Sequence, residues 1–111
     1  MAQPDPGLVE QEQWLAKVQR QIVVSNEHGL HARPAMQLVD LANRFQSDIN
    51  IEKPAPDGHT VEVFADAKSV MAVITLAATK GTRLHLTADG PDAQEAADEI
   101  ARLFEEGFGE E

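Results

Sequence analysis

Residues 20–45 read RQIVVSNEHGLHARPAMQLVDLANRF, and this stretch decides the expected fold. Its first part, residues 20–25, is a β-branched run that favours a strand. From residue 32 to residue 45, apolar residues recur at the spacing of one helical face, which predicts a helix. A short loop with Gly29 joins the two elements, and His31 stands directly before the expected helix start. The stretch therefore predicts a strand, a tight loop and an amphipathic helix in succession.

Hydrophobic periodicity predicts further elements along the rest of the chain. Alternating apolar and polar residues favour strands at 48–53 and 82–87, and residues 61–65 are expected as the second arm of a hairpin after a turn at 54–59. Helical spacing favours helices at 70–79 and from residue 92 through residue 104. Gly81 is expected to end the 70–79 helix, whose Val73 and Ile74 have core spacing. Asp92 and Glu95 are expected to form a capping box at the start of the last helix. This order predicts an α+β domain in which three helices cover one face of a four-stranded antiparallel sheet.

Composition limits the class of protein. The 111 residues suffice for one compact domain, and we expect residues 20–111 to form it, with residues 1–19 as a partly flexible N-terminal extension. No apolar run reaches the roughly 20 residues that a membrane helix needs. The first twenty residues also lack the apolar centre of a secretory signal peptide, so a cytoplasmic protein without membrane insertion is expected. A net charge of −10 argues against nucleic acid as the partner. Because the chain has no cysteine, disulfides and thiolate chemistry are excluded.

His31 is the residue whose surroundings most need a chemical explanation. The first backbone N–H groups of a helix have no internal partner, and the helix dipole leaves partial positive charge there. An anion carried by His31 would therefore meet free amides and the guanidinium of Arg33. A neutral imidazole is also nucleophilic enough to carry a phosphoryl group. Taken alone, His31 could equally be an exposed ring and Arg33 a solvated surface charge.

A metal site is the alternative that the two nearby histidines suggest. His28 and His31, together with Glu27, offer three ligands on one loop, whereas a structural zinc site generally has four. We therefore expect no metal and no other cofactor, and we interpret His28 as a bystander.

Ser69 precedes the helix expected at 70–79 and has two interpretations. As an N-cap it would stabilise that helix by about 1 kcal/mol. As a phosphorylation site it would place negative charge where the helix dipole favours it, so the domain would stay folded and the effect would fall on its partners. Met36, Val70 and Met71 could form an apolar docking patch beside such a charge, or they could be ordinary residues at the edge of the core.

Residues Gly29-Leu30-His31-Ala32-Arg33-Pro34 resemble the active-site signature of HPr, the histidine-containing phosphocarrier of the bacterial phosphoenolpyruvate-dependent sugar phosphotransferase system. Asp66-Ala67-Lys68-Ser69-Val70-Met71 is similar to that family's second site, a serine that a dedicated kinase phosphorylates in many bacteria. The resemblance runs from about residue 20 to the C-terminus and implies an HPr-like open-faced sandwich of β-α-β-β-α-β-α order. The segment 49–69 is several residues longer than the family pattern, and the N-terminal extension is additional to it.

The resemblance implies a function for each residue of the signature. Enzyme I would transfer a phosphoryl group from phosphoenolpyruvate to Nδ1 of His31, and His31 would pass it to a sugar-specific IIA protein or domain. Arg33 would stabilise the phosphoryl group, while Gly29, Ala32 and Pro34 would support the loop and the first helical turn. The chain would then be a monomeric carrier and co-substrate rather than an enzyme. The second site would be the substrate of an HPr kinase/phosphorylase.

Two other functions are compatible with the sequence. The same phosphorelay could have a regulatory output, as in a nitrogen-related branch or in signalling through phosphorylated Ser69. Alternatively, the chain could be an interaction module whose histidine is never phosphorylated, although such a module would be expected to lose His31 or Arg33, and both are present. The identity of the IIA proteins that accept the phosphoryl group would separate transport from regulation.

Overall fold

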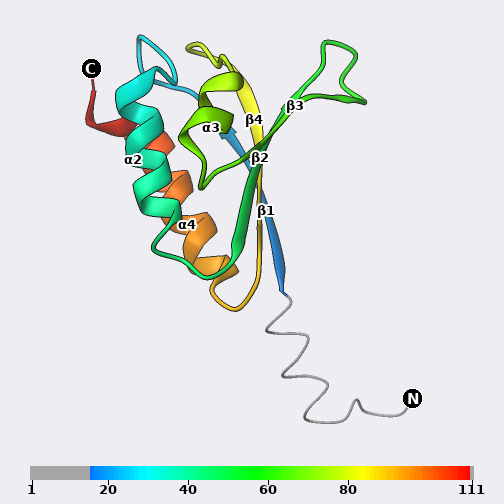
Figure 1. Ribbon diagram of the computed structural model, residues 1–111. Coiled ribbons are helices and arrows are strands. Elements are labelled where there is room, and N and C mark those ends of the chain that lie inside the picture. Colours follow the sequence, from blue (N-terminus) through cyan, green and yellow to red (C-terminus); the bar gives the residue numbers. More distant parts are fainter. Residues whose placement is uncertain (1–15, 111) are drawn as a thin grey trace, which may run out of the picture.

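Four strands and three helices, followed by a short 3₁₀ turn, form the described part of the chain, residues 16–110, in the computed structural model (Figure 1). In chain order they are β1 (Lys17–Val23), α2 (Ala32–Ala42), β2 (Asp48–Pro54), β3 (Val61–Asp66), α3 (Val70–Thr75), β4 (Arg83–Asp89), α4 (Ala93–Glu105) and the turn η1 (Gly107–Gly109). The element order predicted from the sequence is confirmed. Of the predicted N-terminal extension, residues 1–15 lie outside the described residues.

The sheet is antiparallel throughout, with its strands in the order β1-β4-β2-β3. Figure 1 shows the three helices on one side of this sheet, and the predicted α+β open-faced sandwich is confirmed. The alternation in β4 explains the arrangement, because Leu84, Leu86 and Ala88 are buried whereas Arg83 and His85 between and beside them are exposed. The apolar side of β4 therefore faces the helices, and its polar side lies on the outer face of the sheet.

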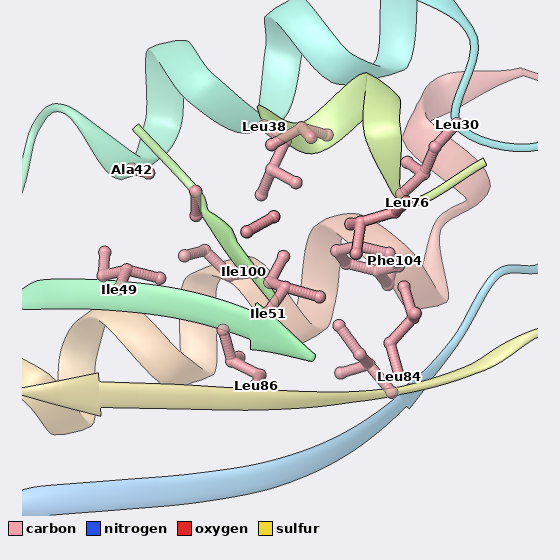
Figure 2. Close-up of a cluster of buried hydrophobic side chains, with 14 of the residues drawn as sticks. Leu30, Leu38, Ala42, Ile49, Ile51, Leu76, Leu84, Leu86, Ile100 and Phe104 are labelled. Carbon is pink, nitrogen blue, oxygen red and sulfur yellow. The ribbon is translucent and has the colours of Figure 1, made fainter. Parts of the chain in front are cut away.

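The core lies between the sheet and the helices. Figure 2 shows side chains from both layers meeting there: Ile49 and Ile51 of β2, Leu84 and Leu86 of β4, Leu38 of α2, and Ile100 and Phe104 of α4. All of them are almost completely buried, and each such side chain contributes about 1.5–3 kcal/mol when it leaves water. This packing fixes the position of α2, and with it the position of His31 at its N-terminal end.

The ends of β1 and α2 differ from the predicted ones. β1 spans Lys17–Val23 rather than residues 20–25, because pairing with β4 continues to Lys17, which lies opposite Asp89. α2 ends at Ala42 rather than at Phe45, since the N–H of Phe45 turns back to the carbonyl of Ala42 at 3.2 Å. Cross-strand pairing and local turns, rather than the apolar pattern, set these boundaries.

α3 is shorter than the helix predicted at 70–79, and Gly81 does not end it. The N–H of Ala77 bonds to the carbonyl of Ile74 at 3.0 Å, and Ala77 has a left-handed φ of 47°. A left-handed residue directly after the last turn ends a helix, as glycine commonly does, but alanine adopts this conformation at a steric cost. Gly81 instead lies in the turn before β4, where its N–H donates to the carbonyl of Val24 at 2.7 Å.

The predicted capping box of Asp92 and Glu95 is not formed. Asp92 is the N-cap of α4, but its carboxylate accepts hydrogen bonds from the Ser47 hydroxyl at 2.6 Å and from the amides of Gln46 and Ser47 at 2.9 Å each. Burial raises the pKa of Asp92, but these hydrogen bonds outweigh that effect, and the pKa lies below the ordinary 3.8. Asp92 therefore fastens the segment before β2 to the start of α4.

Candidate functional site

His31 occupies the N-cap of α2 with an extended backbone, as its position before the helix predicted. Its carbonyl accepts the N–H of Ala35 at 3.0 Å, and Pro34 has no N–H, so the amides of Ala32 and Arg33 are the ones without a helical partner at this end. The imidazole is 41% exposed and does not cap the helix. The ring is therefore accessible at a helix end that carries partial positive charge.

The loop before His31 requires a glycine at position 29. Gly29 has a φ of +69°, and a Cβ there would lie 2.4 Å from the carbonyl oxygen of Ala78. The N–H of Leu30 donates to the same oxygen at 2.9 Å, and the Leu30 side chain is buried. The loop that carries His31 is thus held closely against the segment that follows α3.

Glu110 and Asn26 complete the site, and the sequence analysis missed both. The two carboxylate oxygens of Glu110 lie 3.1 and 3.2 Å from Nε2 of His31. The buried Asn26 donates through Nδ2 to Oε1 of Glu110 at 3.0 Å and to the carbonyl of Gly29 at 2.7 Å. Because Glu110 is 79 residues away from His31 along the chain, no local motif could have identified it.

The electrostatics of the site centre on the Glu110 carboxylate. Hydrogen bonds from Asn26 and His31 lower the pKa of Glu110 below its ordinary 4.5, and the positive charge of Arg33 adds to the effect. Arg33 is exposed in the first turn of α2, close enough for its positive charge to act on this carboxylate.

His28, interpreted from the sequence as a bystander, is a direct neighbour of His31. The two rings pack edge to face with their centroids 6.1 Å apart. Among residues 16–110, no three His, Cys, Asp or Glu side chains are grouped so that they could hold a metal ion. His28 thus bounds one side of the His31 ring.

Ser69 lies at the opposite end of α2 from His31. It is the N-cap of α3, and its hydroxyl accepts the N–H of Ala72 at 3.2 Å, so the capping interpretation is confirmed. The adjacent Lys68 donates from Nζ to the carbonyl of Phe45 at 2.8 Å, just beyond the C-terminal end of α2. Since α2 has 11 residues, its axis runs roughly 16 Å from the end at His31 to the end near Lys68.

Exposed apolar side chains lie on α2 and α3, which pack against each other. Met36 is 55% exposed and Met71 is 75% exposed, while Val70 is half-buried. Val73 and Ile74 were both expected to face the core. Val73 is buried as expected, whereas Ile74 is exposed. We call Met36, Val70, Met71 and Ile74 the docking patch.

Comparison with known proteins identifies the family. Residues 18–106 match the family described as "PTS HPr component phosphorylation site". The chain belongs to the HPr family. The resemblance inferred from the sequence is therefore confirmed, and the matched region includes both His31 and Ser69.

Individual HPr-family proteins are similar over most of their length. The chain is 41% identical over 92 residues to phosphocarrier protein NPr of Proteus mirabilis, which covers 83% of this chain and 96% of the relative. It is 43% identical over 89 residues to the HPr-like protein Crh of Bacillus subtilis, covering 80% and 96%. The crystal structure of phosphocarrier protein HPr from Bacillus anthracis matches with a TM-score of 0.69 at 42% identity, covering 80% and 98%.

HPr proteins are phosphocarriers of the phosphotransferase system, and the site has the parts that such chemistry needs. A dianionic group can be accommodated by the exposed ring of His31, the amides of Ala32 and Arg33 and the Arg33 guanidinium together.

The helices within residues 16–110 are all too short or too polar to span a lipid bilayer.

Proposed function

We propose that this protein accepts a phosphoryl group from phosphorylated enzyme I on His31 and passes it to IIA proteins or domains in sugar uptake. The observation that carries the proposal is the exposed imidazole of His31 at the N-terminal end of α2, beside the amides of Ala32 and Arg33. Membership of the HPr family supports the phosphoryl chemistry, and the sequence around His31 supports the choice of residue.

In the loading step, the lone pair of Nδ1 of His31 attacks the phosphorus atom carried by enzyme I. A new N–P bond forms while the bond between phosphorus and the donor breaks. Arg33 and the helix end stabilise the negative charge on the phosphoryl oxygens. In the delivery step, a nucleophile of the IIA protein attacks the same phosphorus, and the electron pair of the N–P bond returns to Nδ1. Each cycle regenerates the protein, which is therefore a co-substrate rather than an enzyme.

The docking patch is proposed to receive both partners in turn. Enzyme I and the IIA proteins must reach the same histidine, and methionine side chains adapt to differently shaped surfaces. Met71 is 75% exposed, so Met71→Glu should leave the urea unfolding midpoint unchanged while it slows transfer from enzyme I and to the IIA protein. Normal rates in both directions would show that the patch does not take part in docking.

Ser69 is proposed as a regulatory site for an HPr kinase/phosphorylase. A phosphate there would stand at the amide end of α3, where the dipole favours negative charge, so the fold should be retained. It would stand near the C-terminal end of α2, away from His31, beside Val70 and Met71. We infer that it would weaken docking, because a dianion is costly to bury against an apolar partner. Unchanged phosphotransfer to His31 in the Ser69-phosphorylated form would refute the inhibitory role.

A regulatory output is a second candidate, and the name of one relative favours it. Crh is described as the catabolite repression HPr of Bacillus subtilis, which is a regulatory designation. A nitrogen-related or signalling relay would use the same chemistry at His31 and would differ in its acceptor. Transfer to sugar-specific IIA proteins in a panel of acceptors supports the transport function, whereas transfer confined to regulatory acceptors supports the alternative.

The relay is tested by following labelled phosphate from phosphoenolpyruvate through enzyme I and this protein to a IIA acceptor. The unaltered chain should label the acceptor, and His31→Ala should leave it unlabelled. His28→Ala, which removes the neighbouring ring, is the matched control and should relay label. Arg33→Ala should fold normally yet relay more slowly, because it removes charge stabilisation and no core contact. Label that reaches the acceptor through His31→Ala would overturn the proposal.

A further inference from the structure

The segment that follows α4 is built to bring one carboxylate to the His31 ring. In η1, Phe108 is buried with a left-handed φ of 59° and packs edge to face on Phe104, with ring centroids 4.9 Å apart. The N–H of Glu110 donates to the carbonyl of Gly107 at 2.9 Å. This anchored turn places Glu110 beside the loop that carries His31, although nothing in the helical periodicity of α4 requires it.

The buried Asn26 fixes the Glu110 carboxylate in place. Its Nδ2 donates both to Oε1 of Glu110 and to the carbonyl of Gly29, while its Oδ1 has no hydrogen-bond partner among residues 16–110. The opposite orientation of the amide would direct an oxygen at these two acceptors, so the amide orientation is determined by its neighbours. The side chain of Glu110 is 19% exposed, which is consistent with a carboxylate held by the protein rather than free in solvent.

We propose that Glu110 is a positioning residue that keeps the proton of neutral His31 on Nε2 and leaves Nδ1 as the nucleophile. A carboxylate only accepts hydrogen bonds, so the Nε2 atom that it contacts at 3.1 Å must be the donor. In a neutral imidazole with the proton on Nε2, the free lone pair is on Nδ1. The inference rests on the proposed function, because it assigns the ring atom that takes the phosphoryl group.

Glu110 also acts on the phosphorylated ring. When Nδ1 bonds to phosphorus, the ring keeps its Nε2 proton and becomes a cation, and Glu110 offsets that positive charge. When the phosphoryl group leaves, the electron pair returns to Nδ1 and the neutral ring with its Nε2 proton is restored, so no proton moves in either step. The carboxylate is on the Nε2 side of the ring, away from the phosphoryl group on Nδ1. It therefore lies nearer to the cationic ring than to the phosphoryl group.

The first test is the tautomer of His31 in the unphosphorylated protein. Nitrogen-15 NMR of the full chain in alkaline solution, recorded at rising pH until the ring signals no longer change, distinguishes a protonated from an unprotonated ring nitrogen. The unaltered chain should hold the proton on Nε2, and the Nδ1-protonated fraction should rise several-fold in Glu110→Gln and in Glu110→Ala. Glu105→Gln, which removes the same charge from an exposed position at the end of α4, is the matched control and should resemble the unaltered chain.

The second test is the rate of phosphoryl transfer. Glu110→Gln keeps the shape of the side chain and removes its charge, so transfer from enzyme I should fall about threefold, the scale of one partly exposed charge-assisted hydrogen bond. Equal tautomer fractions and equal transfer rates in Glu110→Gln and Glu105→Gln would overturn the role of Glu110 while the carrier function stands. If the unaltered chain takes no label but the tautomer shifts as expected, the carrier function fails and the positioning of His31 by Glu110 stands.

Discussion

Gly29→Ala tests whether the close approach of two backbones holds the histidine loop in place. Gly29 has a φ of +69°, and an alanine Cβ there would lie 2.4 Å from the carbonyl oxygen of Ala78 and 2.9 Å from Cα of Thr79. Both atoms belong to the backbone, so the segment after α3 must move to admit the methyl group. That movement would also stretch the 2.9 Å hydrogen bond from the N–H of Leu30 to Ala78.

The expected loss of stability is the sum of two effects. The left-handed conformation costs a non-glycine residue roughly 1–2 kcal/mol, and the loss of one backbone hydrogen bond costs about 1 kcal/mol or more. Gly29→Ala should therefore destabilise the protein by about 3 kcal/mol. Gly58→Ala is the matched control, because Gly58 has a similar φ of +75° and an added Cβ would meet no described atom within 4 Å. It should show the conformational cost alone, roughly 1–2 kcal/mol.

Urea unfolding of the two variants measures the difference. With an m-value of about 1.5 kcal/mol/M for a protein of this size, the midpoint should fall by about 2 M in Gly29→Ala and by about 1 M in Gly58→Ala. Only Gly29→Ala should also slow phosphorylation of His31, since only that loop carries the histidine. Equal midpoints in the two variants would refute the reasoning, because they would show that the contact with Ala78 adds nothing.

Substitutions at three further positions test other parts of the fold. Ala77→Gly relieves a left-handed φ of 47° at an exposed position. The extra conformational entropy of glycine in the unfolded chain offsets part of this gain, so the free energy of unfolding should rise by about 0.5–1 kcal/mol. A lower urea unfolding midpoint would contradict this. Asp92→Asn weakens the hydrogen bonds to the buried Ser47 and should cost about 2 kcal/mol in urea unfolding at neutral pH. The folded pKa of Asp92 lies below 3.8, so this contribution is complete above about pH 5 and is lost as the pH falls through the folded pKa. The free energies of unfolding of the unaltered chain and of Asp92→Asn should therefore converge in acid. A difference that stays constant with pH would argue against this role of Asp92. Ser69→Ala removes the cap of α3 and should cost about 1 kcal/mol, whereas Ser69→Asp, which can still cap, should cost less; equal losses would rule out capping.

Element type followed from periodicity in this chain, but several element ends did not. β2, β4 and α2 each have one clear apolar face, and that pattern alone identifies them as two strands and a helix. α3 ends early because Ala77 takes a left-handed conformation. The next residue, Ala78, accepts a hydrogen bond at its carbonyl from the N–H of Leu30, and local helix propensity does not include such a distant contact. The capping box at Asp92 failed because Ser47, 45 residues earlier, binds the same carboxylate.

The candidate site divides in the same way into local and distant parts. His31 and Arg33 belong to one short motif, so the sequence identifies them together. Glu110 and Asn26 carry no such signal, because they meet His31 only after α4 and η1 return the chain to the loop. The distance between Ser69 and His31 was also beyond the sequence, since it depends on α3 beginning near the C-terminal end of α2.

The central claim is that His31 carries the phosphoryl group. The most direct measurement is the site and stoichiometry of phosphorylation after incubation of the full chain with enzyme I and labelled phosphoenolpyruvate, read by mass spectrometry under alkaline conditions that preserve phosphohistidine. We predict one acid-labile, alkali-stable phosphoryl group on His31, absent from His31→Ala and retained in His28→Ala. Label that persists in His31→Ala, or that maps to another residue of the unaltered chain, would contradict the account.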